Sequence, residues 1–192
     1  MTEEREHHLV LADQLIQQGD PRGELAVIQD RIFEAHRTKD QPTLERLLPQ
    51  ARAIIEADLS KWVGFDVEVE TVRVDLDGSL NIGLRGGQLL TMRWGVIDSW
   101  YHFDHSDLAR LEQLCDRPAV RLRGFGLAGL HPGNLTQILE ARAFEAIVDV
   151  HVSGSAINSD DVDALARWPL RSFAAVACSG LDDDALVRIG AR

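Results

Sequence analysis

The segment of this chain that comes closest to a chemical site is His102-Phe103-Asp104-His105. Histidine and aspartate are ordinary zinc ligands, and at the end of a strand the three side chains would converge. A metal site needs a third or fourth ligand, and the spacing of the sequence fixes none. A metal-dependent enzyme or metal-binding protein centred on this segment is therefore an alternative hypothesis, and we predict no cofactor.

The other candidate groups favour structural roles. Ser153-Gly154-Ser155 lacks the GxSxG context that places a nucleophilic serine on a tight turn. The acidic runs Asp160-Asp161 and Asp182-Asp183-Asp184 lie at predicted helix starts, where carboxylates cap backbone amides. A calcium loop of the DxDxDG kind is absent from the sequence. We therefore predict that the protein is not an enzyme.

A third charged group surrounds one turn and contains Asp13, Asp20, Arg22 and Glu24. Its Gly-Asp-Pro-Arg-Gly-Glu order lacks the GxxxxGK[ST] pattern of a phosphate loop and follows a predicted helix instead of a strand. We expect a turn that is held by a cap and a salt bridge.

The composition narrows the class of partner and the compartment. The chain has 20 Lys and Arg against 31 Asp and Glu, and its net charge of -11 disfavours nucleic acid. No run reaches the 18 apolar residues of a membrane span, and the acidic start MTEEREHH does not resemble a secretion signal. Cys115 and Cys178 lie far apart in apolar sequence, which suits a reducing compartment. We expect a cytoplasmic protein without a membrane partner.

Residues 1–61 have the pattern of a helical module. Apolar residues at helical spacing lead to Gly19, which tolerates the left-handed conformation that ends a helix. Asp20 can cap the next helix, and Pro21 fits its first turn. We predict helices from Thr2 to about Gln18 and then to about Thr38, and a third that begins at Pro42 or Thr43.

Residues 62–105 change to a period of two, which predicts an antiparallel β meander. Apolar and acidic residues alternate from Phe65 to Glu70, and Asp77-Gly78 is a strong hairpin signal. Further strand segments follow at 80–84, 89–94 and 96–103.

Residues 106–192 alternate helical segments with short apolar strands. Helices are predicted at 107–115, 132–141, 160–166 and 182–189, and strands at 120–127, 147–152 and 173–178. Three apolar positions recur with offsets of five and eight residues: Leu130, Leu135 and Ile138; Ile157, Val162 and Leu165; and Leu181, Leu186 and Ile189. An apolar strand residue precedes each set by five positions: Phe125, Val152 and Val176. Ser155 and Ser179 fall at the ladder position, the place at the end of the strand where leucine-rich repeats usually have asparagine or cysteine, and Cys178 lies one residue before Ser179. The distance between successive sets is in the range of leucine-rich repeats, so we predict leucine-rich-like units that stack to complete a core. The predicted fold class is therefore α+β with a strand-and-helix solenoid.

The N-terminal stretch LADQLIQQGDPRGELAVIQ resembles the bacterial repeat-companion domain, a helical module that precedes leucine-rich repeats. The likeness is carried by Leu9, Val10, Ala12, Asp13, Leu15, Gly19, Asp20, Pro21, Arg22, Gly23, Glu24 and Gln29. The segments Trp94-Gly95-Val96-Ile97 and LEQLCDRPAVRLRGFGL are similar to later parts of the same multi-paralogue proteins of myxobacteria-like bacteria. Gln14 and Leu11 depart from the usual tryptophan and tyrosine. The resemblance implies architecture and no catalytic residue.

We therefore predict a non-catalytic scaffold or regulatory protein that binds another protein. The excess of acidic residues would attract a partner that has a basic surface. Self-association through the C-terminal repeat is a further alternative, because no capping unit is recognisable there. The predicted partner-binding residues lie on the aromatic meander and the repeat strands: Trp94, Trp100, Tyr101, Phe103, His151 and Ser153.

Overall fold

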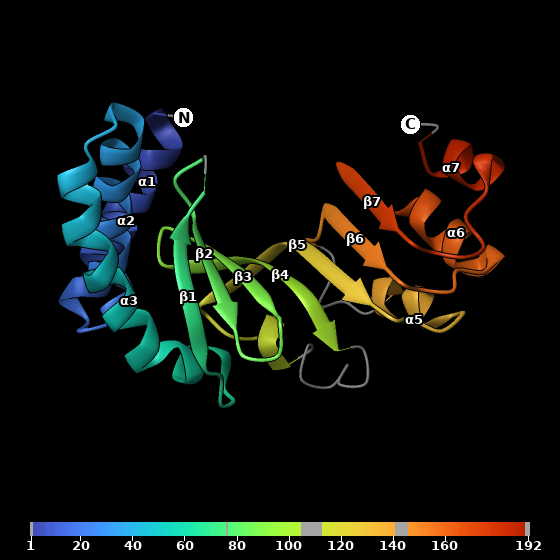
Figure 1. The fold of residues 1–192 in the computed structure, drawn as a ribbon, viewed down its shortest axis with the longest axis horizontal. Coiled ribbons are helices and arrows are strands. Elements are labelled where there is room, and N and C mark those ends of the chain that lie inside the picture. The colour runs from blue at the N-terminus through green and yellow to red at the C-terminus, as the bar shows by residue number, and fades with distance from the viewer. Residues whose placement is uncertain (1, 76, 105–112, 141–145, 191–192) are drawn as a thin grey trace. The chain divides into compact units, whose positions relative to one another are not determined.

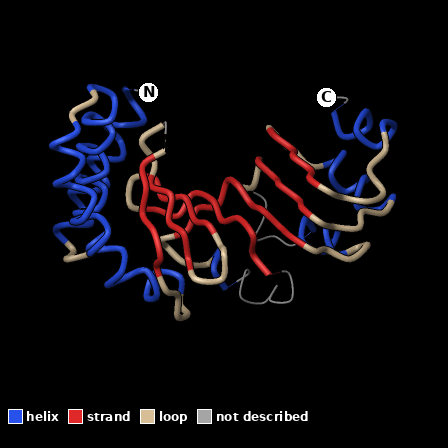
Figure 2. The backbone as a smooth tube through the Cα atoms, in the orientation of Figure 1, coloured by secondary structure: helices blue, strands red, loops and turns tan. Residues whose placement is uncertain are grey.

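The fold is α+β, as predicted: three N-terminal helices precede strands that belong to one sheet, with helices between the later strands (Figures 1 and 2). The computed structural model describes residues 2–75, 77–104, 113–140 and 146–190, without the side chains of 2–4 and 102–104. Contacts group the chain into unit 1, Met1–Asp98 with Arg117–Arg121, and unit 2, Ser99–Asp116 with Leu122–Arg192. The predicted boundaries at residues 61 and 105 stay a prediction.

Unit 1 begins with three helices, α1 (Thr2–Gln17), α2 (Pro21–Thr38) and α3 (Gln41–Val63), which confirms the predicted helical pattern. The breaks follow from local chemistry. Gly19 adopts a left-handed φ of 71° after α1, and the Asp20 side chain then caps α2. Asp40 caps α3 in the same way, by accepting a hydrogen bond from the backbone N–H of Thr43. No described helix combines the length and apolar character that crossing a membrane requires.

Strands β1 (Val69–Val74), β2 (Leu80–Leu84) and β3 (Leu89–Arg93) pair antiparallel, which confirms this part of the predicted meander. One face of β2 and β3 is buried, and the side chains on it are Leu80, Ile82, Leu84, Leu90 and Met92, whereas β1 has only half-buried and exposed residues. β4 (Val96–Asp104) follows after only Trp94 and Gly95, which both have positive φ angles, 52° and 75°. A two-residue hairpin loop with both φ values positive is of type I′, whose twist matches that of the strands.

Unit 2 contains three parallel strands, each followed by a helix. The strands are β5 (Val120–Ala128), β6 (Asp149–Ser153) and β7 (Ser172–Val176), and the helices are α5 (Asn134–Glu140), α6 (Ser159–Arg167) and α7 (Asp183–Gly190). The predicted alternation of strands and helices is therefore confirmed over 120–190. The helix predicted at 107–115 lies largely outside the described residues. The solenoid expected from the repeat stays a prediction.

The repeated apolar positions are buried in the first two sets but not in the third. Leu135 and Val162 are 1% and 2% exposed, whereas their counterpart Leu186 is 48% exposed. The predicted equivalence of Phe125, Val152 and Val176 is wrong. Phe125 pairs with Val150, which in turn pairs with Phe173, and Val176 pairs with Ser153. Counting back from the helices fails because the apolar sets do not lie at one fixed distance from the strands. Leu135 is the second residue of α5, whereas Val162 is the fourth of α6, and the loop after β7 is one residue longer than the loops after β5 and β6.

Candidate interaction surface

The turn of the N-terminal motif, Gly19-Asp20-Pro21-Arg22, builds the junction between α1 and α2. The carboxylate of Asp20 accepts hydrogen bonds from the backbone N–H and the guanidinium of Arg22. These bonds, led by the one from the Arg22 side chain, hold the pKa of the Asp20 carboxyl below its usual value despite partial burial. At Gly23 a Cβ would lie 2.6 Å from the carbonyl oxygen of Ala12, so only glycine lets the two helices approach this closely.

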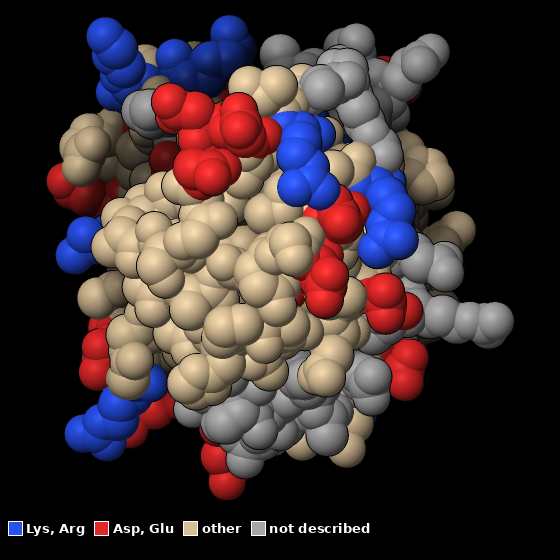
Figure 3. Space-filling model, turned by 90° about the vertical axis from the view of Figure 1, so that its right-hand side faces the viewer, with Lys and Arg blue, Asp and Glu red and all other residues tan. Residues whose placement is uncertain are grey.

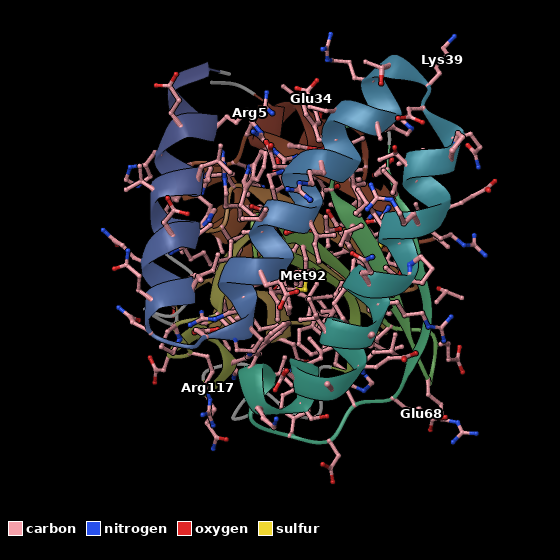
Figure 4. All side chains as sticks on the ribbon, turned by 90° about the vertical axis from the view of Figure 1, so that its left-hand side faces the viewer. Arg5, Glu34, Lys39, Glu68, Met92 and Arg117 are labelled. Atoms are coloured by element: carbon pink, nitrogen blue, oxygen red, sulfur yellow. The ribbon has the colours of Figure 1, made fainter. Side chains whose placement is uncertain are left out.

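The same motif fixes the β3–β4 hairpin onto α2. The buried Gln29 side chain donates from Nε2 to the carbonyl oxygen of Met92 at 2.9 Å and accepts from the N–H of Gly95 at 2.6 Å. Figure 4 shows Met92 behind the helices of unit 1. A Cβ at Gly95 would lie 2.5 Å from the carbonyl oxygen of Arg22, which explains the glycine in this turn. Gln29 therefore has a structural role in this hairpin.

Of the four charged residues around this turn, two contact each other and two are exposed. Asp20 and Arg22 form the predicted cap and ion pair, while Asp13 and Glu24 are exposed. In the C-terminal half of α2, the carboxylates of Asp30 and Glu34 form ion pairs with Arg5 of α1, at 2.5 Å and 2.7 Å (Figure 4). These pairs link α1 to α2, and such half-exposed pairs contribute little to stability one by one.

The hollow between α2 and α3 has a volume of about 340 Å³ and is lined mainly by polar and charged side chains of unit 1: Asp30, Arg31, Glu34, Thr38, Asp40, Thr43 and Arg46. Among the residues that the structure describes, no group of three or more histidine, cysteine, aspartate or glutamate side chains is placed to hold a metal ion. Of the HxDH segment, His105 and the side chains of His102 and Asp104 lie outside the described residues. The hypothesis of a metal site there stays untested.

In unit 2 the three parallel strands present two different faces. Phe125, Leu127, Val150 and Val152 are buried, and the in-register alternation places them on one face. Figure 1 shows α5, α6 and α7 along one side of these strands. The alternate positions form the other face, which we call the open face: Gly124, Gly126, Ala128, Asp149, His151, Ser153, Ser172, Ala174 and Val176. Its side chains range from half-buried at His151 and Ser153 to exposed at Ala174 and Val176.

Tyr101 of β4 lies across the glycines of this open face. A Cβ at Gly126 would lie 2.5 Å from Tyr101 Cδ1, and one at Gly124 would lie 3.1 Å from its hydroxyl oxygen. The two glycines therefore provide the space that the half-buried ring occupies. In the next strand, His151 pairs with Gly126 in register and Ser153 pairs with Ala128. Three of the predicted partner-binding residues, Tyr101, His151 and Ser153, thus belong to one surface.

Two of the other predicted partner-binding residues, Trp100 and Trp94, are not part of the open face. Trp100 is fully buried, so its side chain is a core residue and the prediction that it contacts a partner is wrong. Trp94 belongs to unit 1, where its ring stacks on His8 with 5.6 Å between the centroids and 15° between the planes. The side chain of Phe103 lies outside the described residues. Aromatic character alone therefore did not separate core, turn and surface positions.

Sequence reasoning predicted Asp161 as a helix cap but missed that its side chain also joins α5 to α6. Its fully buried carboxylate accepts from the N–H groups of Gly133 and Thr136, each at 2.9 Å, and from the Thr136 hydroxyl. It also closes a capping box with Asn158, whose side chain accepts from the Asp161 N–H. The predicted role of the acidic runs as helix caps is confirmed here and at Asp182, which accepts from the N–H of Ala185 at 2.8 Å.

Ser155 and Cys178 occupy the ladder position, which lies two residues after the end of β6 and of β7. The Ser155 hydroxyl donates to the carbonyl of Ser153, two residues earlier, and accepts from the N–H of Leu130 at 3.0 Å. The Cys178 thiol lies 3.5 Å from the carbonyl oxygen two residues before it. Ser179 instead pairs with Ala156, so its predicted place in the ladder is wrong. The spacing of the apolar residues does not reveal the register between strands, and this register is what identifies Cys178 as the counterpart of Ser155.

Comparison with known proteins adds no identification: no family model, curated protein or solved structure matches this chain. The open face carries one aromatic ring beside small or polar side chains on parallel strands.

Proposed function

We propose that this protein is a non-catalytic scaffold or regulatory protein that binds another protein through unit 2. In this proposal the three strand-and-helix units act as a leucine-rich-repeat-like solenoid whose strand surface contacts the partner. The proposal places the protein in the cytoplasm, with no nucleic acid, membrane or cofactor involved. The net charge of -11 favours a partner with a basic surface, because opposite charge accelerates encounter.

The observation that carries the proposal is the open face of unit 2. The described helices α5, α6 and α7 lie along one side of the three strands (Figure 1), and the open face on the other side presents Tyr101, His151 and Ser153. Tyrosine suits such a position, because it supplies a large amphipathic contact area with little side-chain entropy to lose. The small residues beside it leave the strands accessible to another protein.

The experiment that tests the proposal is affinity capture from the source cell at about 0.15 M salt, a physiological ionic strength. The bait is compared with Ser153→Arg, which places a long cation on the open face, and with Gln50→Arg. Gln50 is exposed on α3, so this control makes the same change of charge in unit 1. We expect a stoichiometric partner with the wild type and the control, and loss of it with Ser153→Arg. Recovery of no partner, or equal recovery by all three baits, would refute the proposal.

A further inference from the structure

We propose that the edge strand β7, together with α7, is the docking site for an extended basic segment of the partner protein, which adds to the sheet as a further strand. This inference rests on the proposed function and names both the surface and the chemistry of the segment. Addition of a strand to a sheet edge gains affinity from main-chain hydrogen bonds and specificity from alternate side chains. Three features of unit 2 support this mode.

The first feature is the edge itself. β7 is the last strand in the order of the sheet, with β6 beside it and no further strand among the described residues. Native proteins commonly protect such edges with lysine, proline or a bulge. The β7 sequence Ser-Phe-Ala-Ala-Val carries no charge and no proline, and its register with β6 is regular. It therefore offers an unprotected template for another strand.

The second feature is apolar surface beside that edge. Val176 on β7 is 55% exposed, and Leu186 and Val187 on α7 are 48% and 69% exposed. In the preceding unit, the counterpart of Leu186 is Val162, which is buried. Apolar side chains at this spacing are covered when another layer packs on them, so β7 and α7 present a surface that a further layer would bury. The segment must therefore contribute apolar side chains.

The third feature is the charge around this surface. Between residues 159 and 190 the chain has six aspartates and three arginines. Two of the arginines are held in ion pairs, Arg171 with Asp149 and Arg188 with Asp163. Figure 3 shows a wide uncharged area on the side that carries β7 and α7, with both carboxylate groups and Lys or Arg side chains at its border. The surplus of aspartate over arginine in residues 159–190 makes the net charge of this part of the chain negative.

This charge selects among possible occupants. Asp183 and Asp184 are exposed in the first turn of α7. A second copy of the chain would bring two acidic borders together, which is unfavourable, whereas lysine or arginine side chains would complement them. The occupant is therefore an extended segment in which apolar and basic residues alternate.

The probe is a fluorescently labelled eight-residue peptide of alternating valine and lysine, titrated with the full chain and followed by anisotropy at about 0.15 M salt. Two control peptides replace lysine by glutamate, or the two central valines by proline, which cannot donate to a strand ladder. We expect saturable binding of the lysine peptide and at least about tenfold weaker binding of both controls.

Protein variants locate the site. Val176→Lys and Leu186→Lys should each weaken binding of the lysine peptide at least about tenfold, because both add like charge and remove apolar surface. Val10→Lys makes the same change at a position of α1 that is 57% exposed, and it should bind like the wild type. All three sites are exposed, so the variants should keep the wild-type circular dichroism spectrum.

Equal binding of the lysine and glutamate peptides, or unchanged binding by Val176→Lys, would overturn the inference. So would a concentration-dependent dimer in light scattering that Val176→Lys abolishes, because the edge would then belong to a second copy. Failure of the proposed function is distinguishable from failure of the inference. If Ser153→Arg loses the cellular partner while Val176→Lys retains it, the function stands and the docking site on β7 is refuted.

Discussion

Replacement of Asp161 by alanine should destabilise unit 2 more than any other single change of a charged residue there. The buried carboxylate accepts four hydrogen bonds, three from backbone N–H groups and one from the Thr136 hydroxyl. A buried donor that loses its acceptor costs about 1–3 kcal/mol, and loss of an N-cap typically costs about 1 kcal/mol. Because Gly133, Thr136 and Asn158 are half-buried and water can reach them in part, the lower values apply. We expect a loss of about 3 kcal/mol in the free energy of unfolding.

The assay is urea unfolding followed by tryptophan fluorescence, with amide hydrogen exchange at Gly133 and Thr136 to localise the effect. Asp160→Ala is the matched control, because Asp160 is an exposed aspartate in the first turn of the same helix. It should change the free energy of unfolding by no more than about 0.5 kcal/mol. Asp161→Asn keeps one acceptor oxygen and should fall between the two. Equal stabilities of Asp161→Ala and Asp160→Ala would refute the role of this carboxylate as a link between α5 and α6.

Three further outcomes follow from the described contacts. Gln29→Leu should lower the free energy of unfolding by about 2–4 kcal/mol in urea titrations, because it leaves two buried backbone groups of the β3–β4 hairpin without partners. Arg31→Ala changes an exposed residue of the same helix and should have almost no effect. Equal losses in the two variants would contradict the role of Gln29 in holding the hairpin. Gly126→Ala should destabilise the wild type but much less a Tyr101→Ala background, and additive effects in this double-mutant cycle would contradict the packing of the ring on the glycine. Asp20→Asn should be less stable than the wild type above pH 5, because a carboxyl with a lowered pKa stabilises the fold only while it is ionised. The difference in stability should shrink as the pH falls below about 4 and through the lowered pKa of Asp20. A difference that stays constant in thermal unfolding down to pH 2 would contradict this reasoning.

The parts of the fold that local sequence determines were predictable. Gly19, Asp20 and Pro21 end one helix and begin the next through their own backbone preferences, so the N-terminal boundaries agree with the structure to within about two residues. The hairpin signal at Asp77-Gly78 likewise acts over a few residues, and Gly78 has a φ of 80°. Periodicity was sufficient for the strands and helices of 120–190 because each has an apolar face at its own spacing.

The register between strands and the links between units were not predictable in the same way. Loops of unequal length separate the strands from the helices, so a pattern counted on the helices placed Val176 and Ser179 wrongly. The partners of Asp161 lie 25 and 28 residues away in the chain, at Thr136 and Gly133. Trp100 and Tyr101 are neighbours in one strand, yet one is buried and the other half-buried, because successive residues of a strand point to opposite faces.

The most direct test of the central claim, that unit 2 binds a protein segment at its open strand edge, is amide hydrogen exchange of Ser172–Val176 with and without the valine–lysine peptide. In the free protein we predict faster exchange in β7 than in β6, which has a strand on both sides. Saturating peptide should protect the β7 amides and leave α2 of unit 1 unchanged. Exchange in β7 that is the same with and without the peptide would contradict the account.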